Sequence, residues 1–286
     1  MGITSLSPPC LLRQWLFARH RDRLTDIVQE GDIAMKSILS ESSENSQPSR
    51  ALCRRAFLSS AASTCAIAPT VFSSLQLGSG TAALTKEERD HMTPSQVIEE
   101  LKKGNERFRA GKMTSRNYLA EQRSSAAGQY PAAVILGCID SRAPAEIIFD
   151  AGIGDVFNAR IAGNVENEDL LGSMEFACAV AGAKLVLVLG HSACGAVKGA
   201  IDDVVLGNLT GLLARIKPAV STTKFEGQKS SKNPAYVDSV ARTNVALTVE
   251  NIQRRSPTLA DLAKKGTIQI VGAMYDLSTG VVEFTA

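Results

Sequence analysis

The chain has 286 residues, of which 44% are hydrophobic and 21% are charged, proportions that are typical of a folded globular protein and exclude general disorder. The formal net charge of +2 arises within residues 1–85, because residues 86–286 hold 23 Lys/Arg and 23 Asp/Glu. A neutral body without a basic cluster argues against a nucleic-acid partner.

The N-terminal part carries an uncharged run, residues 56–85, directly after Cys53-Arg54-Arg55-Ala56-Phe57-Leu58. This arrangement resembles a twin-arginine export signal, with paired arginines, a weakly apolar stretch and small residues at 80–83 as a cleavage zone. Ser, Thr and Pro69 interrupt the run, so no stable membrane anchor is expected. We therefore interpret residues 1–85 as an unstructured, cleaved leader for export to the periplasm, and residues 86–286 as the folded domain.

Alternatives to periplasmic export stay open at this stage. Residues 1–50 are Ser-rich and acidic, which is unusual upstream of a signal, and Met35 is a candidate true start. A plastid transit peptide, which would lead to the thylakoid lumen, is normally poor in acidic residues, whereas this stretch has six. An uncleaved apolar run would instead tether the protein to a membrane.

The body begins with a clear helix signal at Thr93-Pro94-Ser95-Gln96, in which Thr caps the helix, Pro starts it and Gln reaches back. Continuous apolar runs at 132–136 and 185–189 are typical of strands that are buried on both faces.

Further elements alternate along the body. We expect helices near 144–149 and over 169–180, and a long helix through Val245, Val249 and Ile252 that ends at Ser256-Pro257. Strands are expected near 156–157, 267–271 and 281–284. This alternation predicts an α/β fold with a mostly parallel β-sheet flanked by helices.

The cysteines are too few for a disulfide scaffold, since six are spread over the whole chain. Cys178 lies in an apolar run and is interpreted as a core residue. Cys138 follows the first predicted strand, and His191 and Cys194 follow the strand at 185–189. Because functional sites lie at the carboxyl ends of parallel strands, we expect these three side chains to meet there and bind zinc, with a fourth position open.

Asp140 and Arg142 lie two residues apart beside Cys138, where Arg can hold a carboxylate through two parallel hydrogen bonds. Next to a metal, the held carboxylate would orient a water at the open position. If Arg142 released it, Asp140 could become the fourth zinc ligand and close the site.

Four motifs carry a more specific signal. They are Cys138-Ile-Asp140-Ser-Arg142, Arg160-Ile-Ala-Gly163-Asn164, Gly190-His191-Ser-Ala-Cys194-Gly195 and Gly272-Ala-Met-Tyr275-Asp276-Leu-Ser-Thr279-Gly280. With them the sequence resembles the β-class carbonic anhydrases from about Thr93 to Phe284. The resemblance implies reversible zinc-dependent hydration of carbon dioxide to bicarbonate, with one Zn²⁺ per subunit.

The same resemblance assigns roles to individual residues. Cys138, His191 and Cys194 correspond to the zinc ligands, and Asp140 and Arg142 to the catalytic dyad. Two substrate-binding positions correspond to Gln129, which would act across a dimer interface, and Phe157, which would form an apolar wall of the carbon dioxide pocket. The resemblance also implies a homodimer or a higher even oligomer.

The sequence departs from the family at Ala162 and Phe176, where plant-type relatives have Val and Tyr in the pocket. Two other activities therefore stay open on the same site. Relatives of the family hydrolyse carbon disulfide or carbonyl sulfide, and a zinc-stabilised protein could bind bicarbonate without turnover. The intact Asp140–Arg142 pair argues against the non-catalytic reading, since a purely structural zinc site has four protein ligands.

Overall fold

The computed structural model describes residues 82–285. The twin-arginine motif and the uncharged run up to residue 81 lie outside these described residues. Among residues 82–285, no helix combines the length and the apolar character that a membrane span requires.

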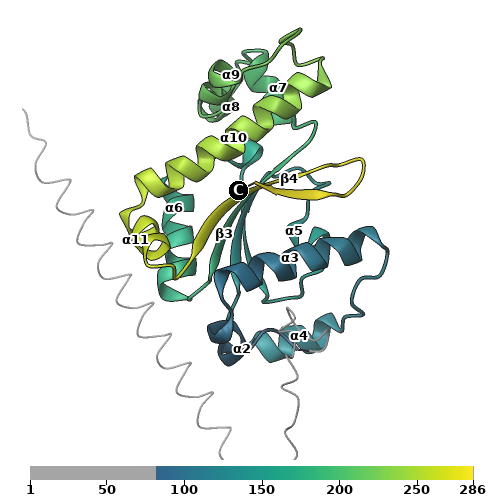
Figure 1. The fold of residues 1–286 in the computed structure, drawn as a ribbon, viewed down its shortest axis with the longest axis vertical. Helices are drawn as coiled ribbons and strands as arrows, with labels where there is room; N and C mark the ends of the chain where they lie inside the picture. The colour runs from purple at the N-terminus through teal and green to yellow at the C-terminus, as the bar shows by residue number, and fades with distance from the viewer. Residues whose placement is uncertain (1–81, 286) are drawn as a thin grey trace, which may run out of the picture. The chain divides into compact units, whose positions relative to one another are not determined.

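A five-stranded sheet in the order β2-β1-β3-β4-β5 forms the centre of the domain (Figure 1). Its strands are β1 (Ala133–Gly137), β2 (Val156–Arg160), β3 (Leu185–His191), β4 (Gln269–Tyr275) and β5 (Val282–Thr285). The pairs β1–β2, β1–β3 and β3–β4 are parallel, and only β5 runs antiparallel to its neighbour. A short turn joins β4 to β5, and a parallel pairing would need a much longer crossover. The predicted α/β fold with a mostly parallel sheet is confirmed.

Helices cover both faces of the sheet. They are α2 (Lys86–His91), α3 (Pro94–Arg109), α4 (Tyr118–Ser125), α5 (Ala145–Ile148), η1 (Ala162–Asn164), α6 (Glu168–Glu175), η2 (Phe176–Val180), α7 (Gly195–Ile201), α8 (Gly207–Ala214), α9 (Lys217–Thr222), α10 (Pro234–Arg255) and α11 (Pro257–Lys264). Side chains of α10, α6 and α11 share one apolar cluster with the sheet, and those of α3 and α5 share the other.

Two of the three inner strands, β1 and β3, are buried along their whole length. Val186 and Val188 of β3 belong to the cluster beneath α10, whereas Leu185 and Leu187 belong to the cluster beneath α3. This alternation explains why the sequence of each strand is apolar throughout: every residue meets a helix-covered face. Cys178 is also buried in the core, as predicted.

Sequence signals located the ends of the longer helices well. Thr93 accepts a hydrogen bond from the Gln96 amide at 3.2 Å, and the Gln96 side chain accepts one from the Thr93 amide at 2.8 Å, which confirms the predicted cap of α3. The predicted helix over 169–180 is observed as α6 continued by the π-helical turn η2. Six helices were not predicted from the sequence: α2, α4, α7, α8, α9 and α11. Each has only six to eight residues, too few turns for a clear period.

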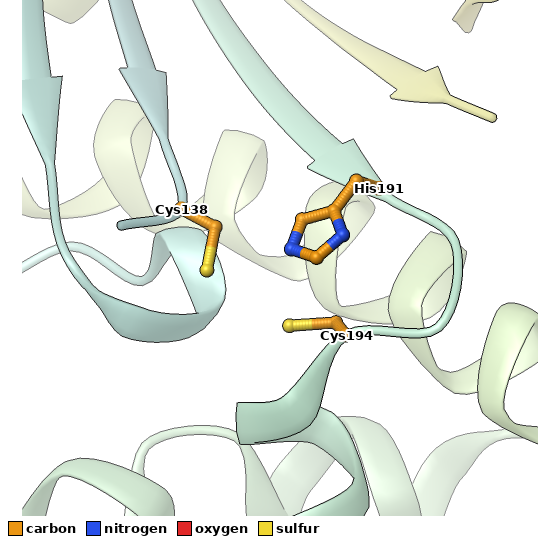
Figure 2. Close-up of side chains that lie close together, drawn as sticks. All are labelled: Cys138, His191 and Cys194. Atoms are coloured by element: carbon orange, nitrogen blue, oxygen red, sulfur yellow. The ribbon is translucent and has the colours of Figure 1, made fainter. Parts of the chain in front are cut away.

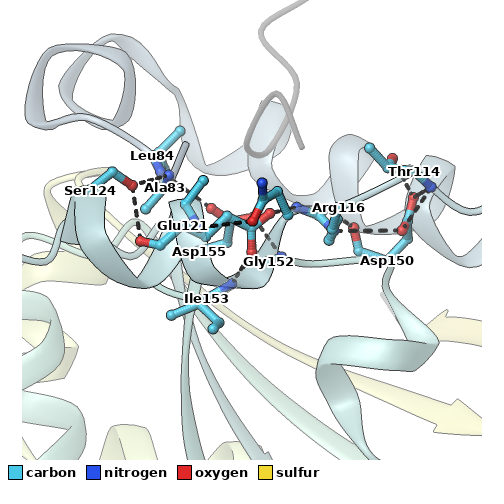
Figure 3. A network of polar contacts seen from close by, with 12 residues as sticks. Ala83, Leu84, Thr114, Arg116, Glu121, Ser124, Asp150, Gly152, Ile153 and Asp155 are labelled. Atoms are coloured by element: carbon cyan, nitrogen blue, oxygen red, sulfur yellow. Dashed lines mark hydrogen bonds and ion pairs between the residues drawn. The ribbon is translucent and has the colours of Figure 1, made fainter. Parts of the chain in front are cut away.

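A buried charge cluster joins the segment before β1 to the loop between α5 and β2 (Figure 3). The Arg116 guanidinium lies 3.1 Å from the Glu121 carboxylate, 3.8 Å from that of Asp155 and 3.9 Å from that of Asp150. All four side chains are at most 3% exposed, and burial raises the pKa of Asp155. Gly152 is required beside them, because a Cβ there would lie 2.4 Å from the guanidinium.

Replacing Arg116 by Met should lower the free energy of unfolding by about 3–5 kcal/mol, because it leaves buried carboxylates without their shared cation. Urea denaturation of the purified protein measures this loss. Arg123→Met is the matched control on α4: Arg123 is exposed, and its loss should change stability by no more than about 0.5 kcal/mol. Equal effects of the two substitutions would contradict the role of the cluster.

Candidate metal centre

Three predicted ligands converge where β1 and β3 end. Cys138 directly follows β1, His191 is the last residue of β3, and Cys194 is the N-cap of α7. Figure 2 shows the three side chains pointing toward one another. Their ligand atoms all lie within 4.8 Å of one another, and all three residues are buried. The prediction that these side chains meet is confirmed.

The short turn from His191 to Cys194 is held by the neighbouring strand. Ser192 donates its amide to the Tyr275 carbonyl at 2.9 Å, and its hydroxyl accepts the Leu277 amide at 2.9 Å. Ala193 has a φ of 54°, a left-handed conformation that is costly for a residue with a side chain. The turn brings Cys194 back toward His191, so the strained backbone of Ala193 is part of the geometry that brings the two side chains together.

The histidine is prepared for a metal ion. His191 Nδ1 lies 2.9 Å from the Ser192 carbonyl oxygen, so a proton on Nδ1 donates there and Nε2 keeps its lone pair. Nε2 is buried and has no hydrogen-bond partner among the described residues. A buried nitrogen without a partner is costly, and a metal ion would satisfy it. With two sulfurs and one imidazole nitrogen, the donor set fits tetrahedral zinc.

The two thiols interact strongly without a metal. A hydrogen bond from Cys194 lowers the pKa of Cys138 to about 4, although burial acts in the opposite direction. The same contact, together with burial, raises the pKa of Cys194. Burial lowers the pKa of His191, but its contact with Cys138 outweighs this and raises it overall. Zinc binding must therefore displace protons from this group, as is usual for thiolate ligands.

Asp140 and Arg142 form the two-pronged pair that their spacing predicts. Arg142 Nε donates to Asp140 Oδ1 at 2.9 Å, and Nη2 donates to Oδ2 at 2.8 Å. The Arg142 amide adds a third bond to Oδ1 at 3.0 Å. These contacts hold the pKa of the Asp140 carboxyl well below its usual range, so it is ionised and accepts hydrogen bonds.

The carboxylate of Asp140 lies next to the metal position. Its Oδ2 is 3.9 Å from His191 Nε2, the nitrogen that is free to bind a metal ion. Both carboxylate oxygens are held by Arg142, and the group of three ligands does not include Asp140. A metal ion held by the three residues alone would therefore have a fourth position for water or substrate. Asp140 as a fourth ligand in a closed state stays a prediction.

The two predicted substrate-binding residues lie in different settings. Gln129 is exposed in the segment that precedes β1. Phe157 on β2 is partly buried against the core, and its ring packs edge-on against Phe176 with centroids 6.4 Å apart. Their roles toward substrate stay predictions.

Sequence reasoning gave no role to two residues that shape the Cys138 loop. Arg160 donates to the Cys138 carbonyl at 2.8 Å and to the Asp140 carbonyl at 2.6 Å. Gly163 donates its amide to Cys138 Sγ at 3.3 Å. Both belong to the motif Arg160-Ile-Ala-Gly163-Asn164, so the motif was visible, but its contacts depend on β2 lying beside β1.

Two cysteines and a histidine that converge at the strand ends of a parallel α/β sheet are typical of a zinc-binding protein. Comparison with known proteins gives the family. The model of the carbonic anhydrase family matches residues 133–282. Carbonic anhydrase 2 of Mycobacterium tuberculosis is 40% identical over 186 residues, covering 63% of this chain and 87% of the relative. The carbonic anhydrase of Mycolicibacterium smegmatis is 40% identical over 185 residues, covering 64% and 89%.

Solved structures agree with the sequence relatives. A tetrameric β-carbonic anhydrase from the fungus Sordaria macrospora has a TM-score of 0.50 and 26% identity, and the match covers 56% of this chain and 83% of that one. The chain belongs to the carbonic anhydrase family, and its fold is that of the β class.

Replacing Asp140 by Asn should lower carbon dioxide hydration at least about 100-fold while zinc content stays unchanged, because Asn keeps the size but not the charge of the acceptor. Stopped-flow hydration and metal analysis of the same samples measure both quantities. Asp169→Asn, an exposed acid at the start of α6, is the control and should keep full activity. A fully active D140N protein would contradict the role of this carboxylate.

Proposed function

We infer that this protein catalyses the reversible hydration of carbon dioxide to bicarbonate and a proton. The observation that carries the inference is a buried Cys138–His191–Cys194 group beside the Asp140 carboxylate, both oxygens of which are bound by Arg142. A structural zinc site would be closed by four protein ligands, whereas this one leaves a place for water or substrate.

Zinc, when bound, supplies the Lewis acidity that makes water nucleophilic near neutral pH. The chain supplies the rest. His191 and the two thiolates fix the position of the reaction, and Asp140 accepts a hydrogen bond from the attacking water, which orients a lone pair toward the substrate. Arg142 keeps that carboxylate ionised and prevents it from occupying the open position. Phe157 would present an apolar surface to carbon dioxide.

The assembly that we propose is a homodimer or a higher even oligomer. Large apolar side chains are exposed around the β2 edge and the loops next to it, including Ile139, Ile147, Ile153 and Phe176. A second copy would cover them and would bring its own Gln129 toward the substrate. The Sordaria macrospora relative is described as tetrameric, which supports an oligomer for this chain.

Purified full-length protein should contain zinc and hydrate carbon dioxide, and Cys194→Ser should lose both properties, since a serine hydroxyl is a poor zinc ligand. Cys178→Ser is the control, because Cys178 is buried away from the metal group and should affect stability but not zinc content. Stopped-flow hydration and metal analysis decide the matter. Folded, zinc-loaded protein that does not hydrate carbon dioxide would contradict the proposed enzymatic function.

The hydration rate should rise toward alkaline pH. The Cys138 and Cys194 thiolates would offset both positive charges of zinc. The pKa of the attacking water should therefore stay above the value of about 7 that is reached with neutral ligands. Asp140 does not add a second step, because its lowered pKa keeps it ionised throughout the neutral range. A rate that is flat from mildly acidic to alkaline pH, measured by stopped flow, would argue against this charge balance.

We further propose that the protein is exported by the twin-arginine route to the periplasm. Support comes from the Arg54-Arg55 pair and the uncharged run that follows it. This route moves folded proteins, so Cys138 and Cys194 could take up zinc in the reducing cytoplasm and arrive protected from disulfide formation.

Residues 1–90 fused to a reporter should be exported, and replacing both Arg54 and Arg55 by Lys should abolish that export, because this route requires the arginine pair itself. Fractionation and reporter activity measure the result. Export that survives the double replacement would exclude the twin-arginine route.

A further inference from the structure

The zinc-binding thiolate of Cys138 receives a hydrogen bond from the backbone. The Gly163 amide donates to Cys138 Sγ at 3.3 Å. A donor aimed at a thiolate stabilises its charge and fixes the direction of its remaining lone pairs, as outer-shell partners of metal ligands generally do. Gly163 makes this contact with a φ of 74°, which a residue with a side chain rarely adopts.

A single polar side chain on α10 holds the other side of Gly163. Asn244 Nδ2 donates to the Gly163 carbonyl at 2.8 Å, although the two residues are 81 positions apart. Asn244 is 3% exposed, and its neighbours Ala241 and Val245 belong to the apolar cluster under α10. A buried amide on such a face is costly unless it is hydrogen-bonded, and the bond to Gly163 offsets that cost for Asn244.

Packing leaves no room for a side chain at position 163. A Cβ on Gly163 would lie 2.5 Å from Ile216 Cδ1 and 3.3 Å from Ala196 Cβ. Ala196 lies in the first turn of α7, two residues after the ligand Cys194. The η1 turn is therefore confined between the Cys138 sulfur and the helix that begins at the second thiolate.

We propose that Asn244 is a positioning residue for the zinc site: it holds the Gly163 turn so that the Gly163 amide bonds the Cys138 thiolate. The contacts form a chain from α10 through the Gly163 carbonyl and amide to Cys138 Sγ. Asn244 touches neither zinc nor substrate. Its expected effect is on the affinity for zinc and on the electronic state of the thiolate. The role of Asn244 rests on the zinc-dependent function proposed above.

The first test replaces Asn244 by Leu, which keeps the approximate volume and removes the donor. Zinc should bind 10- to 100-fold more weakly, as measured by competition with a chromogenic chelator. In cobalt-substituted protein, the sulfur-to-metal charge-transfer band should move to longer wavelength, because a thiolate that loses a hydrogen bond gives up its electrons more easily. Asn244→Ala is the second variant if Leu prevents folding, which urea denaturation reveals.

Thr248→Val is the matched control. Thr248 lies one turn further along α10, is 2% exposed, and among the described residues makes no hydrogen bond to Gly163. It should keep the zinc affinity and the charge-transfer band of the unmodified protein. Unchanged zinc affinity in a folded Asn244 variant, or an equal loss in T248V, would overturn the proposal.

A further measurement detects the hydrogen bond itself, first in the unmodified chain and then in N244A. In protein loaded with ¹¹³Cd and labelled with ¹⁵N, the Gly163 amide proton should show scalar coupling to the metal through the Cys138 sulfur, and N244A should weaken it. Absence of this coupling in the unmodified protein would overturn the proposal. Metal-loaded protein without carbon dioxide hydration would instead count against the proposed function, because none of these readouts depends on turnover.

Discussion

Parallel pairing of β1 with β3 is the constraint on which the rest of the site depends. Val134 pairs with Val186 and Gly137 with Leu189, so both strands end at the same edge of the sheet. Cys138 and His191 are 53 residues apart in the chain, and the pairing of the strands places them next to each other. Apolar residues bury both faces of these strands, so the register that aligns the ligands is fixed by the core itself.

Charged groups around the metal site are paired so that positive and negative charges compensate one another. Two thiolates would neutralise the charge of zinc, and the Asp140 carboxylate is compensated by Arg142 in a pair that is open to solvent on the Arg142 side. Arg160 binds the carbonyl groups of the same loop, so a second arginine determines the path of the chain between ligand and dyad. With zinc bound, the negative charges of the two thiolates and of Asp140 would therefore be compensated by zinc and Arg142.

Far from the metal, the Arg116 cluster shows a different use of charge. It ties the segment before β1 to the loop before β2, near the residues where these strands begin, whereas the ligands lie where β1 and β3 end. Burying several carboxylates around one guanidinium is costly, and it is tolerated where each partner has hydrogen bonds of its own, as Asp155 has from the Gly152 amide. Such a cluster fixes the orientation of the two segments through ion pairs and hydrogen bonds.

The sequence alone determined the chemistry and the strand plan. Apolar runs identified β1 and β3, and residue types at their ends identified the zinc ligands and the Asp140–Arg142 pair, because ligand identity and strand burial are both local properties. The short helices lacked enough turns to show a period. Only the tertiary structure decided that Gly163 reaches Cys138 and that Asn244 reaches Gly163. Those contacts join segments that are distant in the chain, and nothing in the local sequence around Asn244 indicates which carbonyl it will meet when α10 packs on the sheet.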